Sequence, residues 1–168
     1  KIANKLFKLR DHGRGASGKV ETWGTNSRLD NAQAMVLSIK LDFIKKDLRR
    51  RRELALIYHK GLRDLKELNL PPAPLENSKN FDVFQNYELT AERRDKLRIF
   101  LKKNGIGTLV QWNGQPIHSI KGIKVKRSSF KKTDAIFKKI LMLPLNTSLK
   151  NSEVKYTINK IRSFYGYK

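Results

Sequence analysis

One long helical pattern constrains this chain more than any other feature. From Leu29 to Leu65, apolar residues recur at the three- and four-residue spacing of an α-helix, and no Gly or Pro interrupts them before Gly61. Asp30 and Asn31 lie where the N-terminal turn of such a helix favours them. A helix of some 30 residues is roughly 45 Å long. Because that length exceeds what a small core covers, we expect a helix that bridges two domains or lies on a partner subunit.

Length, cysteine usage and hydropathy narrow the class of protein. The chain has 168 residues, of which 39% are hydrophobic, and this suits one domain, or one and a half, with a real core. It has no cysteine, which excludes a disulfide-stapled domain, a thiol nucleophile and a cysteine zinc site. The three histidines do not have a zinc spacing, so no metal site is expected. Without a membrane span or a signal sequence, we expect a cytoplasmic protein with no membrane partner.

The net charge raises the question of an anionic partner. Lys and Arg exceed Asp and Glu by 37 − 15 = +22, which is compatible with nucleic acid or a phosphorylated ligand but also with a Lys- and Asn-rich genome. The densest basic run, Arg49–Arg52, is spread around a helix by its geometry, so we interpret it as a solvated or partner-facing stretch. A second basic cluster, Lys121–Lys132, is expected in a loop that could meet an anion.

The N-terminal residues indicate a chain that starts inside a longer protein. The sequence does not begin with Met. Ile2, Leu6 and Leu9 form the apolar stripe of a helix with no N-cap before it. We expect this helix, residues 1–11, to end at Gly13 and to be followed by a glycine-rich loop over residues 13–26.

The second half of the sequence predicts alternating strands and helices. Prolines after Leu70 end the long helix and force an extended linker. The pattern strand–helix–strand predicts an α/β or α+β domain. The expected elements are a strand over Phe81–Leu89, a helix capped by Thr90 that ends at Asn104-Gly105, a strand over Ile106–Trp112, irregular residues 113–132, and a short helix over Ala135–Leu143. A last helix is expected to begin at Asn151 or Ser152, with Val154, Ile158, Ile161 and Tyr165 facing inward.

The residues alone form no complete active site. Neither Gly13-Arg14-Gly15 nor the glycine pair at 105 and 107 extends to a Rossmann or P-loop fingerprint, and there is no serine nucleophile elbow. His59, in the long helix, is interpreted as a surface or packing residue. His118 follows a predicted strand in a loop, where sites of α/β domains are often built.

Seven short segments nevertheless occur in an order that is informative as a set. Each is weak alone, but together they extend over nearly the whole chain. They are Leu9–Gly13 (Leu-Arg-Asp-His-Gly), Trp23–Asp30 (with Gly-Thr-Asn-Ser-Arg-Leu), Gln33–Ala34, Arg51–Tyr58 (Arg-Arg-Glu-Leu-Ala-Leu-Ile-Tyr), Arg94–Gly107 (Arg-Asp-Lys-Leu to Asn-Gly-Ile-Gly), Gln111–His118 (ending Pro-Ile-His) and Leu141–Leu145 (Leu-Met-Leu-Pro-Leu).

This ordered set resembles the C-terminal part of the DegT/DnrJ/EryC1/StrS aminotransferases, pyridoxal-phosphate (PLP) enzymes that aminate nucleotide-linked keto-sugars. The resemblance implies an α/β fold, namely the C-terminal portion of a fold-type I PLP-dependent transferase with a long bridging helix and a small α/β domain. It implies three regions: residues 1–30 end the large PLP domain with its cross-dimer loop, residues 31–69 form the bridging helix, and residues 70–168 form the small domain.

The resemblance also assigns roles to three residues. Asn26 matches the asparagine that reaches across the dimer to the phosphate of the cofactor, pyridoxal 5'-phosphate, and an amide donor suits a phosphate oxygen. Arg28 matches a residue at the active-site entrance, and His118 matches a loop histidine near the sugar nucleotide. The segment Trp112–Gln115 departs from the family's commoner aromatic-x-x-Pro form. No lysine here matches the Schiff-base lysine, so the resemblance gives this chain no catalytic residue.

The resemblance implies a homodimeric parent enzyme that transfers an amino group, in our interpretation from glutamate, to a nucleoside-diphosphate keto-sugar. The 168 residues alone are expected to be inactive. Two alternatives stay open: a basic nucleic-acid-binding module, which the motif set disfavours, and a non-catalytic regulatory relative of the family.

Overall fold

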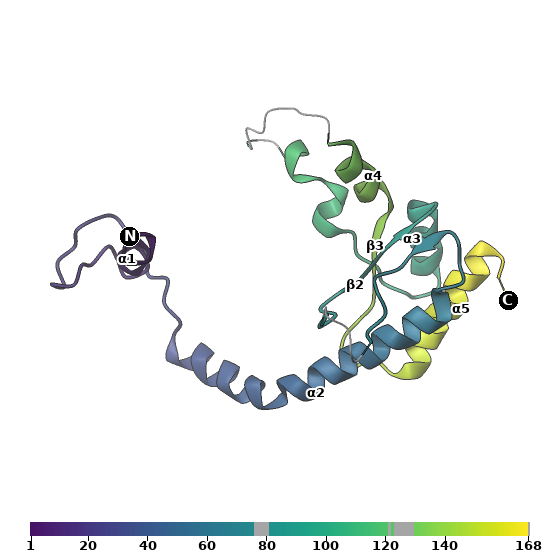
Figure 1. The fold of residues 1–168 in the computed structure, drawn as a ribbon, viewed down its shortest axis with the longest axis horizontal. Coiled ribbons are helices and arrows are strands. Elements are labelled where there is room, and N and C mark those ends of the chain that lie inside the picture. The colour runs from purple at the N-terminus through teal and green to yellow at the C-terminus, as the bar shows by residue number, and fades with distance from the viewer. Residues whose placement is uncertain (76–80, 121, 123–129, 168) are drawn as a thin grey trace. The chain divides into compact units, whose positions relative to one another are not determined.

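The computed structural model describes residues 1–75, 81–120, 122 and 130–167, and these form two compact units. Unit 1 comprises Lys1–Lys45 and unit 2 comprises Lys46–Lys168. The division falls within one helix, α2 (Asn31–Leu62), which Figure 1 shows as the longest element of the chain. The domain boundaries expected from the resemblance, at residues 30 and 69, stay a prediction.

Unit 1 begins with α1 (Ile2–Leu9), which confirms the predicted N-terminal helix. After it the chain folds back on itself, because the backbone N–H of His12 donates to the carbonyl of Thr25 at 3.0 Å. Gly24 lies so close to the turn that a Cβ there would be 2.3 Å from the backbone nitrogen of Gly13. Glycine is therefore required at position 24 for the loop to close on the end of α1.

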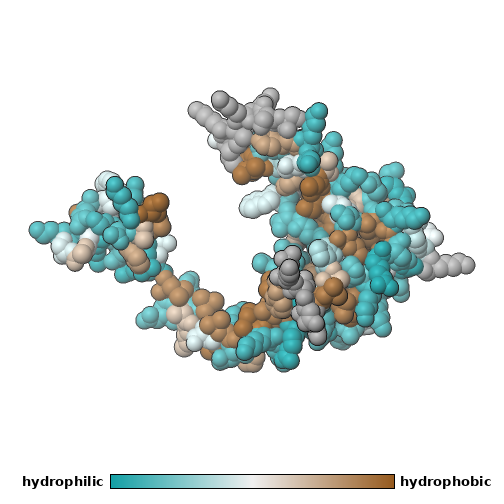
Figure 2. Space-filling view, in the orientation of Figure 1, coloured by the Kyte–Doolittle hydropathy of each residue, from teal (hydrophilic) through white to brown (hydrophobic). Residues whose placement is uncertain are grey.

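Helix α2 begins where the sequence predicted and ends slightly earlier. The Asp30 carboxylate accepts the backbone N–H of Gln33 at 2.8 Å, which is N-terminal capping. The helix ends at Leu62 rather than Leu65. Its first half exposes its apolar side chains, as the apolar residues along it show in Figure 2. Its second half buries four residues: Leu54, Ala55, Tyr58 and Leu62.

Unit 2 is built on a three-stranded antiparallel sheet in the order β1-β2-β3. The strands are β1 (Leu68–Asn69), β2 (Tyr87–Ala91) and β3 (Ile140–Leu143). Leu89 of β2 lies opposite Leu141 of β3. Alternate residues of β2 are buried, so one face of the sheet points into the core.

Three helical segments cover the buried face: the second half of α2, α3 (Arg94–Lys103) and α5 (Asn151–Tyr165). Helices α2 and α5 approach closely at Gly61, where a Cβ would lie 2.8 Å from Ile158 (Figure 1). The shorter α4 (Lys131–Lys139) and two 3₁₀ turns, η1 (Gln111–Gly114) and η2 (Ile117–Ser119), contribute no fully buried residue. The arrangement confirms the α/β fold class predicted from the sequence. Of the residues predicted to face inward in the last helix, Val154, Ile158 and Ile161 are buried, and Tyr165 is partly buried against the core.

The arginine run of α2, interpreted above as a solvated or partner-facing stretch, instead contacts unit 2 through three of its four side chains. Its last three arginines donate to backbone carbonyls of loops within unit 2. Arginine suits this task because its planar fork offers several N–H donors in fixed geometry. The bonds are Arg50 to Leu149 (2.6 Å), Arg51 to Gln85 (3.0 Å), and Arg52 to Asp82 (2.7 Å) and Leu75 (3.0 Å).

The first predicted strand and helix cap were both misplaced. Residues 81–86 are not in a strand, since Phe84 has a left-handed φ of 48° and β2 begins only at Tyr87. Thr90, predicted to cap a helix, instead lies within β2 opposite Ile140. A β-branched residue suits a strand as well as a cap, and the pairing with β3 decides between them here. Helix α3 begins after Arg93, whose side chain makes no capping bond.

Two later predictions were also wrong. Residues 106–112 form no regular strand; Leu109 alone makes an antiparallel bridge, with its N–H 3.2 Å from the carbonyl of Met142. The short helix predicted over Ala135–Leu143 is α4 up to Lys139, after which the chain continues as β3. A continuous apolar run such as Ile140–Leu143 fits a buried strand or a buried helix equally well by periodicity.

Candidate functional site

The structure brings two of the three predicted site residues together in unit 1. The Oδ1 atom of Asn26 accepts a hydrogen bond from Nε of Arg28 at 3.1 Å. Nη1 of Arg28 also lies 3.2 Å from a carboxylate oxygen of Asp11, which pairs with Asn26 across an antiparallel bridge. The fold of the loop onto the end of α1 therefore sets these three polar side chains side by side.

This cluster leaves hydrogen-bond donors for a ligand. Asn26 uses its carbonyl oxygen toward Arg28, and its amide nitrogen has no partner among the described residues. Both side chains are exposed. An amide N–H and a guanidinium are donors that fit phosphate oxygens. Nearby, Trp23 is 95% exposed.

The third predicted residue, His118, lies in unit 2 on the turn η2. Its Nε2 is 2.8 Å from Oδ1 of Asp134, which lies in the first turn of α4. Its ring stacks on Phe130, with centroids 4.7 Å apart and planes inclined by 22°. The side chain is 19% exposed. His118 is therefore held by two groups but remains accessible at one edge.

The backbone before His118 is strained. Trp112 and Asn113 have φ values of 50° and 52°, and Gly114 follows at 75°. Two consecutive non-glycine residues in the left-handed region are uncommon, and each costs of order 1–3 kcal/mol unless the surroundings fix it. Trp112 is 75% exposed. This is the segment whose sequence departs from the commoner form of the motif.

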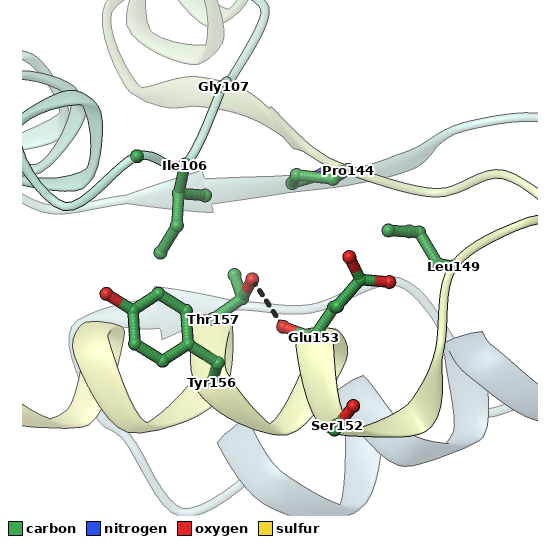
Figure 3. A pocket seen from close by; sticks show the side chains of 9 residues that line it. Ile106, Gly107, Pro144, Leu149, Ser152, Glu153, Tyr156 and Thr157 are labelled. Carbon is green, nitrogen blue, oxygen red and sulfur yellow. Dashed lines mark hydrogen bonds between the residues drawn. The ribbon is translucent and has the colours of Figure 1, made fainter.

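A separate pocket of about 470 Å³ opens between the Gly105–Gly107 loop and α5 (Figure 3). The Thr157 hydroxyl in it donates to the carbonyl of Glu153, and the Glu153 carboxylate accepts the backbone N–H of Lys150. Its polar groups thus serve the first turns of α5. His118 does not line this pocket, so it is not part of the predicted site.

Sequence reasoning missed the partners of the site residues. Asp11 beside Arg28, and Asp134 and Phe130 beside His118, became visible only in the fold. A separation of 16 residues between His118 and Asp134 is not a spacing that any local motif marks. The aromatic and acidic residues that flank the start of α4 were the only signal available.

Two other predictions concern charge and metals. Most of the basic cluster Lys121–Lys132 lies outside the described residues; of its cations, Lys131 and Lys132 are described and begin α4. Within the described ranges, no three His, Asp or Glu residues gather in a metal-binding arrangement. In that same part of the chain, no helix combines the length and the apolar character needed to cross a membrane.

Comparison with curated proteins finds relatives with two kinds of name, a transaminase and a regulatory protein. The chain is 31% identical over 166 residues to the dTDP-3-amino-3,4,6-trideoxy-alpha-D-glucose transaminase of Streptomyces venezuelae, covering 97% of this chain and 43% of that protein. It is 32% identical over 168 residues to a "Pleiotropic regulatory protein" of Geobacillus stearothermophilus, covering 98% and 44%. The chain therefore spans less than half the length of the curated relatives that it matches.

Two solved structures of similar fold cover the chain to the same extent as the curated relatives. The crystal structure of S. venezuelae DesV superimposes with a TM-score of 0.83 at 31% identity, covering 97% of this chain and 44% of that one. A DegT DnrJ EryC1 StrS aminotransferase from Brucella abortus superimposes with a TM-score of 0.85 at 27% identity, covering 98% and 44%. The fold is thus that of the C-terminal portion of an aminotransferase. Residues 1–162 match the DegT/DnrJ/EryC1/StrS aminotransferase family, and the chain belongs to it.

Proposed function

We propose that this chain is the C-terminal part of a PLP-dependent enzyme that transfers an amino group to a nucleoside-diphosphate keto-sugar. Glutamate is the proposed donor, and a cytoplasmic homodimer the proposed assembly. The observation that carries the proposal is the Asn26–Arg28 pair, exposed and with N–H donors left over, in a chain that belongs to a sugar aminotransferase family. Transaminases that act on dTDP-sugars are among its relatives.

The residues present fit the phosphate end of PLP. The free amide N–H of Asn26 suits a phosphate oxygen, and the Arg28 guanidinium beside it adds positive charge. When bound, PLP supplies an electron sink for exchange of an amino group. Asn26 would hold the cofactor, and Arg28, which Asp11 and Asn26 orient, would bind the carboxylate of the amino donor or the diphosphate of the sugar nucleotide.

Residues 1–168 on their own are proposed to be inactive. Covalent attachment of PLP requires a lysine, and the family motifs in this sequence assign that role to no lysine here. The side chains of Asn26 and His118 bind and orient a ligand; neither is placed to attack a carbon. Activity therefore requires the part of the family fold that this chain does not span.

The test joins residues 1–168 to the N-terminal part of the S. venezuelae relative and measures PLP retention. We expect Asn26→Ala to lose a charge-assisted hydrogen bond of roughly 1.5–3 kcal/mol, which corresponds to about 10- to 150-fold weaker PLP binding. Asn4→Ala, a change of another exposed asparagine of unit 1, is the matched control and should not change retention. Equal PLP affinity in the two variants would overturn the role of Asn26.

A regulatory function is the second candidate, and one observation favours it: the G. stearothermophilus relative is named a regulatory protein. The same joined protein separates the two. Amination of a dTDP-keto-sugar in the presence of glutamate supports the enzyme. PLP retention without amination favours the regulator. The nucleic-acid alternative keeps the net charge of +22 in its favour, but part of the arginine run is engaged within the chain, because Arg50, Arg51 and Arg52 bind loop carbonyls.

A further inference from the structure

The contact between His118 and Asp134 determines which ring nitrogen of the neutral His118 carries the proton. Nε2 of His118 is 2.8 Å from Oδ1 of Asp134, which is the distance of a good hydrogen bond. A carboxylate can only accept, so in the neutral ring the proton must be on Nε2. The hydrogen bond made by one ring nitrogen therefore decides whether the other nitrogen carries a proton.

The other nitrogen, Nδ1, is therefore a lone-pair acceptor. It makes no hydrogen bond with any described residue. The ring is fixed on one face by Phe130, with centroids 4.7 Å apart, and the side chain keeps 19% of its surface exposed. Carboxylate and aromatic ring together restrict the rotation of the imidazole, so the direction of the Nδ1 lone pair is set before any ligand arrives.

The surroundings suit a positioning role rather than a core contact. Asp134 lies in the first turn of α4, and its side chain is 47% exposed. Helix α4 has no buried residue, so the pair does not anchor a hydrophobic core. On the other side, His118 follows a loop with strained φ values at Trp112 and Asn113. Strain of this kind persists where the surrounding structure over-determines a conformation, and it occurs often at ligand sites.

We infer that Asp134 is a positioning residue that fixes His118 as the Nε2–H tautomer, so that Nδ1 accepts a hydrogen bond from a substrate hydroxyl. This inference rests on the proposed function, because a sugar supplies such hydroxyls. It makes His118 an acceptor rather than a proton donor toward its ligand. Phe130 supports the same orientation by stacking.

The first test is nitrogen-15 NMR of the imidazole groups in the 168-residue chain, at a pH where they are neutral. His118 is expected to be a single Nε2–H tautomer with a visible Nε2–H proton. Asp134→Ala should lose that proton signal by exchange with water. The matched control is Asp95→Ala, which removes an exposed carboxylate from the first turn of α3 and should leave the signal intact.

Three results of this test would overturn the inference. They are an Nδ1–H tautomer in the unsubstituted chain, a slow Nε2–H signal that survives Asp134→Ala, and an equal loss in Asp95→Ala. His12, an exposed histidine of unit 1, gives the reference spectrum of an unheld ring.

The second test asks whether the positioned nitrogen meets substrate, in the joined protein described above. Asp134→Ala and His118→Ala are each expected to raise KM for the sugar nucleotide more than they lower kcat. The double variant should be no worse than His118→Ala alone, because Asp134 acts through His118. Additive losses would show independent roles and contradict the inference. If the unsubstituted joined protein makes no amino sugar, the proposed function fails, while the NMR result still decides the role of Asp134.

Discussion

Units 1 and 2 share one helix but use its apolar residues in opposite ways. In residues 31–45, α2 exposes Met35, Ile39 and Phe43 along one side and Leu37, Leu41 and Ile44 along another. In residues 46–62, the same helix buries its apolar side chains against the sheet and α5. The hydrophobic core lies entirely in unit 2, whereas backbone hydrogen bonds hold the loop of unit 1 to α1. The difference shows that helical periodicity marks apolar faces without telling which of them are covered.

The largest expected effect compares two leucines of α2. Leu54→Ala in unit 2 removes a fully buried side chain and should lower the free energy of unfolding by about 2–5 kcal/mol. Leu41→Ala in unit 1 removes a side chain that is 67% exposed and should change it by less than about 0.5 kcal/mol. Urea unfolding followed by far-UV circular dichroism measures both. Similar losses in the two variants would break the comparison between the units.

The next effect depends on alkaline pH. Burial raises the pKa of Tyr58 from 10.0 to about 12, and its hydroxyl donates to the Pro144 carbonyl at 2.9 Å. The folded state favours the protonated phenol, so Tyr58 contributes to the free energy of unfolding. That contribution is fully present below pH 10 and is lost as pH rises from 10 through about 12. It amounts to about 2–3 kcal/mol.

Burial raises the pKa of the neighbouring Tyr87 as well, and that of Tyr165, so three phenols among the described residues of unit 2 resist ionisation. Urea unfolding at a series of alkaline pH values measures the loss. Tyr58→Phe should show a shallower decline with pH than the unsubstituted chain. A decline of the same steepness in Tyr58→Phe would assign the effect to other groups.

A smaller effect separates the arginines of the basic run. Arg52→Ala removes hydrogen bonds to the carbonyls of Asp82 and Leu75 and should destabilise unit 2 by about 1–3 kcal/mol. Arg49→Ala removes the same charge from an exposed position and is the matched control. Thermal unfolding of both variants measures the difference in stability. Equal stability of the two variants would show that Arg52 behaves as a solvated charge.

The smallest expected effect is the sharpest test of independence. Removing residues 1–45 deletes no member of the core, so the free energy of unfolding of residues 46–168 should stay within about 0.5 kcal/mol of that of the full chain. Native-state hydrogen exchange of the core amides measures it. A large loss of protection would show that unit 1 stabilises unit 2.

The sequence allowed prediction of the elements with strong local signals. Helix α2 with its Asp30 cap, the end of α3 at Asn104-Gly105 and the inward face of α5 were predicted from periodicity and capping residues. The strands could not be predicted as well, because Thr90 and Ile140–Leu143 fit either state and only their mutual pairing decides.

The site residues were likewise predictable only where a local sequence motif marked them. The motif order pointed to Asn26, Arg28 and His118, and the fold places the first two in contact. Their acidic partners, Asp11 and Asp134, are set by tertiary structure and had no local signature. Likewise, the sequence alone indicates surface charge for the run Arg49–Arg52. Only the fold shows that Arg51 and Arg52 donate hydrogen bonds to carbonyls of neighbouring loops.

The uncovered apolar side chains of α2 have a consequence for the behaviour of the chain in solution. A net charge of +22 makes molecules repel one another at low ionic strength, which opposes contact between these side chains. Added salt shortens the range of that repulsion to about 8 Å at physiological concentration. Electrostatic repulsion therefore gives the chain its colloidal stability. The protein should stay dispersed in dilute buffer and associate as salt is added.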